Sequence, residues 1–177
     1  MRIGILALSL SLSGAVFAQA PTDPQIAHIA ATAHSIDIAR GKDALKKSKN
    51  AEVKQFAEQM VEDHGAGLKE AQALLKKLGV KPEDNPTSQA LNKQAKEEKA
   101  KLSKLKGKAF DKEYINHEVA YHKAVIDAVK NTLIPNAKNA ELKQLLTDAG
   151  PTLEGHLKHA ENVQAQLGGS SDTSARK

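Results

Sequence analysis

The stretch KNAEVKQF at residues 49–56 returns as KNAELKQL at residues 138–145, with six of its eight residues unchanged. An Asn side chain accepts hydrogen bonds from the free backbone N–H groups at a helix start, and Glu in the first turn meets the positive end of the helix dipole. Asn50 and Asn139 are therefore predicted to be matching N-caps of two equivalent helices. A helical hairpin that occurs twice explains the repeat; chance is the alternative, because Asn-Ala-Glu commonly begins a helix.

Four segments carry apolar residues at steps of three and four, the spacing typical of amphipathic helices. The first is expected to have Asp23 as its cap and Pro24 at its first position, and the third to stop before Pro135. Gly150 and Pro151 should bend or split the fourth. No segment alternates strictly between apolar and polar residues as a strand would. The sequence predicts an all-α four-helix bundle with helices at residues 24–47, 51–78, 108–133 and 139–167.

A lysine-rich segment, residues 87–106, is expected to form an extra helix that connects the second and third helices of the bundle. Seven lysines between Lys93 and Lys108 face only two glutamates, Glu97 and Glu98. We interpret this run as a solvated helix face, with weak contact to anionic envelope components as the functional alternative. Nucleic acid is not an expected partner, because the chain offers few aromatic rings for base stacking.

Residues 1–18 have the features of a cleavable signal peptide: Arg2, then an apolar run, then the small-x-small pattern that ends at Ala18. The apolar run is short for a membrane span, although a membrane anchor is the alternative. The chain has no cysteine, which excludes disulfides and a lipid-modified cysteine. We therefore expect an exported periplasmic protein, associated with the envelope at most, and no membrane span in the mature chain. Beyond the signal peptide the predicted parts are a linker at 19–23, the bundle domain at 24–167 and a disordered polar tail at 168–177.

Most enzyme classes lack their usual signals in this sequence. There is no Gly-rich phosphate loop, no Gly-x-Ser-x-Gly motif and no thiol, which removes the usual basis for nucleotide, hydrolase and thiol-redox chemistry. No catalytic residue is predicted, and a non-catalytic role is favoured while the question of an activity stays open.

Histidines on apolar faces are the main functional signal. His64 and His156 fall on such faces of the second and fourth helices, and on the third helix two adjacent apolar faces compete, one with His117 and one with His122. Buried imidazoles need hydrogen-bond partners or a bound ion, and imidazole suits divalent transition metals such as zinc, copper or iron. Our hypothesis is that these histidines bind a divalent transition metal as a cofactor. The sequence does not identify a partner molecule. The alternative is a structural or interaction module of the envelope, in which these histidines only pack.

Three carboxylates accompany the histidines. Asp63 precedes His64, Glu118 lies one turn before His122, and Asp37 lies on the inward face of the first helix. Gly41, one turn after Asp37, should allow close helix approach. The predicted metal ligands and supporting groups are His64, His122, His156, Asp37, Asp63 and Glu118.

Counting residues along the helices leaves the arrangement of the histidines open. His64 and His122 lie closer to their connecting turns than His117 and His156, by several ångströms of helix rise. One shared site needs the bend at Pro151; otherwise two pairs form, His64 with His122 and His117 with His156. The two Glu-x-x-His pairs of a di-iron centre are missing, so ferroxidase chemistry is not expected.

Three motifs resemble a family of bacterial exported proteins, the domain of unknown function 4142 family, whose members are often labelled predicted outer membrane proteins. The motifs are FAEQMVEDH at residues 56–64, FDKEYINHEVAYHKAV at 110–125 and TLEGHLKHA at 152–160. The resemblance covers about residues 24–167 and implies a ferritin-like fold, without implying an activity. Where the family often has Glu, this chain has the shorter Asp37. Carried onto this sequence, the family pattern falls on Asp63, His64, Phe110, Asp111, Tyr114, His122, Leu153 and His156.

Overall fold

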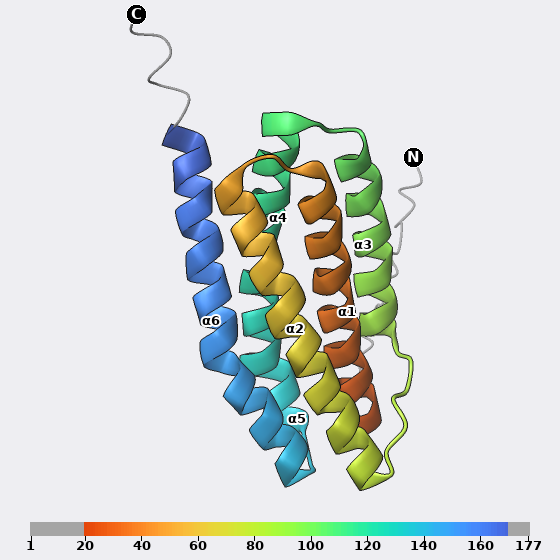
Figure 1. Cartoon of the computed structure of the whole chain (residues 1–177). Coiled ribbons are helices and arrows are strands. Elements are labelled where there is room, and N and C mark those ends of the chain that lie inside the picture. The colour runs from red at the N-terminus through yellow and green to blue at the C-terminus, as the bar shows by residue number, and fades with distance from the viewer. Residues whose placement is uncertain (1–19, 170–177) are drawn as a thin grey trace, which may run out of the picture.

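The computed structural model describes residues 20–169, and within that range every regular element is a helix. Figure 1 shows the main helices as a bundle of four, α1, α2, α4 and α6, beside the shorter α3. The elements are α1 (Asp23–Lys47), α2 (Ala51–Leu78), α3 (Pro86–Ser103), α4 (Gly107–Ala128), the π-helical turn η1 (Val129–Leu133), α5 (Ile134–Asn136) and α6 (Ala140–Gly169). The predicted all-α bundle with an extra connecting helix is confirmed.

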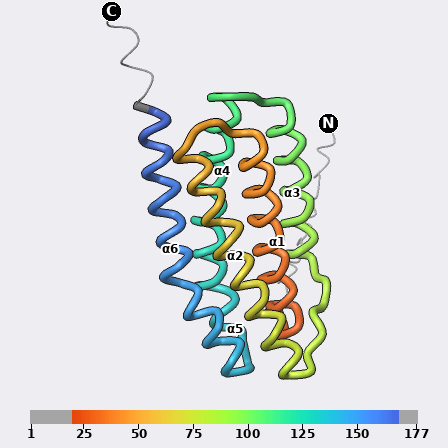
Figure 2. The backbone as a smooth tube through the Cα atoms, in the orientation of Figure 1, coloured from red at the N-terminus to blue at the C-terminus, as the bar shows by residue number. Residues whose placement is uncertain are grey.

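The hairpin α1–α2 packs against the hairpin formed by α4 and α6, so that each bundle helix has two neighbours. Helix α3 lies against the outer side of α1, where Figure 2 shows it beside the bundle. None of the described helices is both long and apolar enough to cross a membrane. The predicted signal peptide and residues 170–177 of the predicted tail lie outside the described residues, whereas Gly168 and Gly169, which we assigned to the tail, end α6.

Both copies of the repeated stretch begin a helix as expected. The Asn50 side chain accepts a hydrogen bond of 3.1 Å from the backbone N–H of Val53, and Asn139 accepts one of 3.0 Å from Leu142. Each bond satisfies one of the N–H groups that a helix start leaves unpaired. The second helix of each hairpin therefore begins with an equivalent cap, which is consistent with the predicted duplication.

Replacing Asn50 with Ala is expected to lower the free energy of unfolding by about 1 kcal/mol, because the start of α2 loses its side-chain cap. The measurement is urea denaturation followed by circular dichroism. Asn92→Ala is the control, since Asn92 is an exposed residue inside α3. An Asn50→Ala protein as stable as the Asn92→Ala protein would contradict the capping role.

The predicted role of Asp23 is wrong. Helix α1 already includes Asp23, after Thr22, and the Asp23 carboxylate accepts hydrogen bonds from the backbone N–H groups of Lys138 and Asn139 at 2.8 and 2.9 Å. These two N–H groups lie just before α6. Asp23 therefore acts at the start of a different helix, a tertiary contact that its local sequence does not reveal.

The predicted stop before Pro135 is also wrong. The backbone widens into η1, where the N–H of Ile134 bonds to the carbonyl of Val129, and the helical path continues through α5. Pro135 has no N–H to donate and its ring crowds the preceding turn, so a wider turn accommodates it. Pro151 does not split α6, which is continuous through it. Figure 1 shows the two halves of α6 running in different directions, as a bend there predicts.

Two apolar clusters fill the bundle, one at each end. The first includes Phe56 and Val163, and the second includes Ile26 and Leu142. Between them lies a group of buried polar side chains, which we call the polar layer: Asp37, His64, Glu118, His122 and His156.

Helices α1 and α2 approach each other closely beside this layer. A Cβ at Gly41 would lie only 2.9 Å from the carbonyl oxygen of Ala57 and 2.9 Å from the Val61 side chain. Because glycine has no side chain there, α1 approaches α2 closely one turn after Asp37, as predicted.

Candidate metal centre

Three imidazoles from three helices meet in the polar layer. His64 comes from α2, His122 from α4 and His156 from α6, and their side chains are at most 4% exposed. Each offers a ring nitrogen, and these three nitrogens all lie within 4.8 Å of one another. A tetrahedral site with metal–nitrogen bonds of about 2.1 Å needs its nitrogens about 3.4 Å apart, so small ring movements would bring this triad onto one ion.

The outer nitrogens of two triad rings are held by hydrogen bonds. Nε2–H of His156 donates to the Asp63 carboxylate at 2.8 Å, and Nδ1–H of His122 donates to the carbonyl oxygen of Glu118 at 3.0 Å. Such bonds fix the tautomer and the ring orientation of metal-binding histidines. In both rings the tautomer leaves a lone pair on the inner nitrogen.

The third ring, His64, is held by another histidine. Nδ1 of His64 lies 3.0 Å from Nδ1 of His34, so one of the two carries the shared proton. When His64 carries it, its Nε2 also has a free lone pair. The inner nitrogens His64 Nε2, His122 Nε2 and His156 Nδ1 are buried and have no hydrogen-bond partner within the described part of the chain.

Two buried carboxyl groups lie beside the triad. Oδ2 of Asp37 is 3.4 Å from Nε2 of His64, and Oε2 of Glu118 is 3.6 Å from Nδ1 of His122. Burial raises the pKa of Glu118 to about 7. Burial, and then the neighbouring Glu118 carboxyl, raise the pKa of Asp37 well above its usual range. The Asp37 oxygen is placed beside an inner nitrogen, where it can supplement the imidazoles as a ligand, whereas the Glu118 oxygen lies beside the outer nitrogen of His122.

Burial keeps the imidazoles neutral. It lowers the pKa of His64 to about 2 and that of His122 to about 4, and it also lowers the pKa of His156 and His34. Nearby histidines lower the pKa of His64 further. Neutral imidazole is the form that binds metal ions, so the triad needs no deprotonation at neutral pH.

The six predicted site residues lie at different positions relative to the inner nitrogens. The three histidines form the triad, and Asp37 and Glu118 lie beside it. Asp63 is instead on the outer side of His156, where it is partly exposed. Asp63 can thus orient a ligand without facing the inner nitrogens.

The pairing of His117 with His156 does not occur. His117 accepts a hydrogen bond of 3.0 Å from Nη2 of Arg40 and lies outside the triad. The pairing depends on a helical path that ends before Pro135, but α5 continues this path to Asn136. The longer path brings His122 and His156 to similar distances from the turn between α5 and α6.

Sequence reasoning missed two side chains that contact this region. His34 bonds to His64, and its signal was the repeat: it precedes Asn50 by nearly the same number of residues as His122 precedes Asn139. Arg40 is 9% exposed, with its guanidinium 4.7 Å from the ring centre of Tyr121. Its positive charge opposes the burial that raises the pKa of Asp37 and Glu118.

Other residues of the resemblance lie in the apolar clusters. Phe110 and Tyr114 stack at 6.2 Å between ring centres in the first cluster, and Leu153 lies in the second. Asp111 is buried beside Phe110. These residues are part of the packing on either side of the polar layer, and the groups that could bind a metal are those of the triad.

Gly67 makes room for the His34 ring. A Cβ at Gly67 would lie 2.7 Å from Cε1 of His34, whereas a Cβ at Gly65 would meet nothing within 4 Å. Gly65→Ala is expected to raise the free energy of unfolding by up to about 1 kcal/mol, as Ala for Gly does inside helices. Gly67→Ala should lose that gain because it displaces His34 from His64. Urea denaturation of the two variants checks this; equal stabilisation by both would contradict it.

The sequence model of a family described as "Domain of unknown function (DUF4142)" matches residues 12–163 of this chain. Among solved structures, the fold is similar to that of "CopM in the Cu(II)-bound form", with a TM-score of 0.62 and 18% sequence identity. The similarity covers 83% of this chain and 98% of that one, and at this identity it concerns the fold alone. None of the curated proteins matches the chain in sequence.

Proposed function

The chain belongs to the DUF4142 family, and from that premise we propose that it binds a divalent transition metal ion through His64, His122 and His156 in the periplasm. One observation carries the proposal: three buried inner nitrogens converge from three helices and have no hydrogen-bond partner among residues 20–169. Leaving a buried polar atom unpaired costs about 1–3 kcal/mol. A single ion would satisfy all three nitrogens at once.

The residues present fit such an ion. Imidazoles supply the main ligands, Asp37 has an oxygen beside the inner nitrogen of His64, and Glu118 lies beside the outer nitrogen of His122. Asp63 and His34 hold the outer nitrogens of the rings, a role that outer partners commonly have in metal sites. A bound ion would supply positive charge to the polar layer, where the two carboxyl groups then become stable as carboxylates.

Copper(II) is the metal that we propose first. Affinity for nitrogen and oxygen ligands rises along the first-row divalent metals to Cu(II) and is lower for Zn(II). The chain has no cysteine to favour a softer, thiolate-bound ion. The Cu(II) named for CopM, whose fold is similar, supports testing this metal before zinc and iron.

Calorimetric titration of the metal-stripped chain from residue 19 with Cu(II), Zn(II) and Fe(II) tests the proposal. We expect one ion per chain with a Kd tighter than about 10 μM, or about −7 kcal/mol. Electron paramagnetic resonance of the Cu(II) form should show coupling to several imidazole nitrogens. Absence of binding at this level for all three metals would reject the proposal and favour an envelope module in which the histidines only pack.

A further inference from the structure

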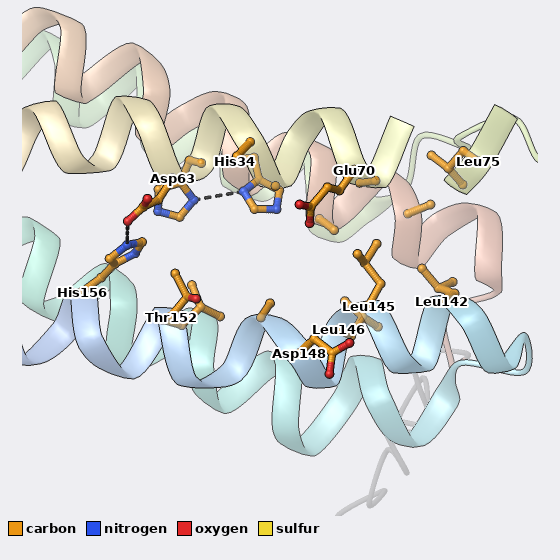
Figure 3. A pocket seen from close by; sticks show the side chains of 18 residues that line it. His34, Asp63, Glu70, Leu75, Leu142, Leu145, Leu146, Asp148, Thr152 and His156 are labelled. Carbon is orange, nitrogen blue, oxygen red and sulfur yellow. Dashed lines mark hydrogen bonds and ion pairs between the residues drawn. The ribbon is translucent and has the colours of Figure 1, made fainter. Parts of the chain in front are cut away.

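A cavity of about 320 Å³ lies against the triad, between α2 and α6. His64 and His156 line it, so the cavity reaches two of the three triad rings from the outside. Figure 3 shows Leu142, Leu145 and Leu75 at the end of the cavity away from His156. The cavity therefore extends from the surface of the bundle to two of the triad residues.

The charged side chains in this cavity are all carboxylates. Asp63, Glu70 and Asp148 line it, and among the described residues no Lys or Arg does, although the chain has 26 of them. Cavities next to α3 are instead lined by Lys47 together with other lysines. A cleft with one sign of charge raises the local concentration of ions of the opposite sign, so this cavity favours cations in an otherwise basic protein.

His34 and Glu70 both line this cavity. The His34 ring is partly exposed, packs over Gly67 and bonds through Nδ1 to the triad residue His64. Figure 3 shows the Glu70 carboxylate directed into the same space as the His34 ring. An imidazole and a carboxylate are both ligands that can replace water on a divalent transition metal ion.

We propose that this cavity is the entry route of the metal ion and that Glu70 and His34 receive the ion before it reaches the triad. The inference rests on the proposed function and adds a path to it. The ion exchanges water for the Glu70 carboxylate, then meets His34, and moves inward to His64 and His156, whose inner nitrogens hold it. Because the lining supplies carboxylates and an imidazole that can replace water, the ligand of this route is the hydrated ion.

The test compares metal-loading rates of the stripped chain by stopped flow. Cu(II) quenches tyrosine fluorescence, and the chain has two tyrosines and no tryptophan. The variants are Glu70→Gln and Glu70→Lys. Their matched controls are Glu58→Gln and Glu58→Lys, which make the same charge change at an exposed position of α2 outside the cavity.

Glu70→Gln should lower the association rate constant about 3- to 10-fold at low salt, and Glu70→Lys should lower it further. The control variants should load like the wild type, and the difference should shrink as salt screens the charge. Because a group on the route changes loading and release together, the Kd should change less than the association rate.

Three outcomes would overturn the entry route. Equal loading rates in Glu70 and Glu58 variants, with wild-type Kd, would reject the route and leave the triad function intact. A weaker Kd with an unchanged association rate would assign Glu70 to the final site instead. Failure of the wild type to bind Cu(II), Zn(II) or Fe(II) by calorimetry would reject both the route and the proposed function.

Discussion

Replacing His156 with Ala is expected to weaken Cu(II) binding by at least about 100-fold. Loss of an outer partner alone costs 10- to 100-fold in metal sites, and His156 supplies one of the inner nitrogens directly. The measurement is competition with a chelator of known affinity, at neutral pH and fixed salt. Circular dichroism of the variant shows whether the bundle remains folded.

His159→Ala is the matched control for this variant. His159 lies on the same helix one turn after His156, is partly buried, and bonds through Nδ1 to Gln59 at 2.8 Å, outside the triad. The control should keep its affinity within about threefold of the wild type, since positions outside the ligands and their outer partners contribute little. Equal losses in His156→Ala and His159→Ala would remove the triad as the binding site.

Without metal, the free energy of unfolding should fall steeply as the pH is lowered from 7.5 to 5. Stability rises with pH wherever the unfolded chain binds more protons than the folded chain. Burial lowers the pKa of His122 from 6.5 to about 4. Between those values the unfolded chain carries this proton and the folded chain does not. The contribution of neutral His122 to the free energy of unfolding is therefore fully present above pH 6.5. It decreases as the pH falls, by about 2 kcal/mol at pH 5.

Carboxyl groups oppose this trend. The pKa of Glu118 is raised to about 7 by burial, and the pKa values of Asp37 and Glu98 are also raised, so these groups add stability as the pH falls. The imidazoles outnumber them, and the net loss by pH 5 should reach at least about 2 kcal/mol. The imidazoles whose pKa is lowered are those of His34, His64, His117, His122 and His156.

Urea denaturation in EDTA at pH 7.5 and pH 5 measures this loss. His122→Leu, which replaces the fully buried imidazole with an apolar side chain, should lose about 2 kcal/mol less than the wild type between the two pH values. A wild-type stability that is the same at both pH values would contradict the burial of neutral imidazoles.

Local signals predicted most of the helices. Asn50 and Asn139 satisfy their own helix starts, and Gly79 ends α2 with a φ of 64°, a conformation that glycine adopts without strain. The apolar stripes also placed His64 and His156 inward, because burial of a helix face follows from its period, but on α4 they did not decide between His117 and His122.

Contacts between helices were harder to predict. Asp23 looks like a local cap in the sequence, yet its carboxylate bonds to Lys138 and Asn139, far along the chain. The height of each histidine depends on η1 and on the bend of α6, which a uniform rise per residue does not include. The hydrogen bond between His34 and His64 likewise depends on how α1 and α2 pack, which the local sequence does not determine.

The polar layer also bears on how the molecule unfolds. The two apolar clusters share no side chain, and each draws on α1, α4 and α6. Packed regions of this kind tend to open as separate cooperative units in hydrogen exchange. Between them lies the polar layer, in which several buried polar atoms have no hydrogen-bond partner among the described residues, so the two ends of the metal-free bundle can open independently. An ion bound in the polar layer would connect α2, α4 and α6 between the two clusters. Metal binding should therefore slow hydrogen exchange at both ends of the bundle.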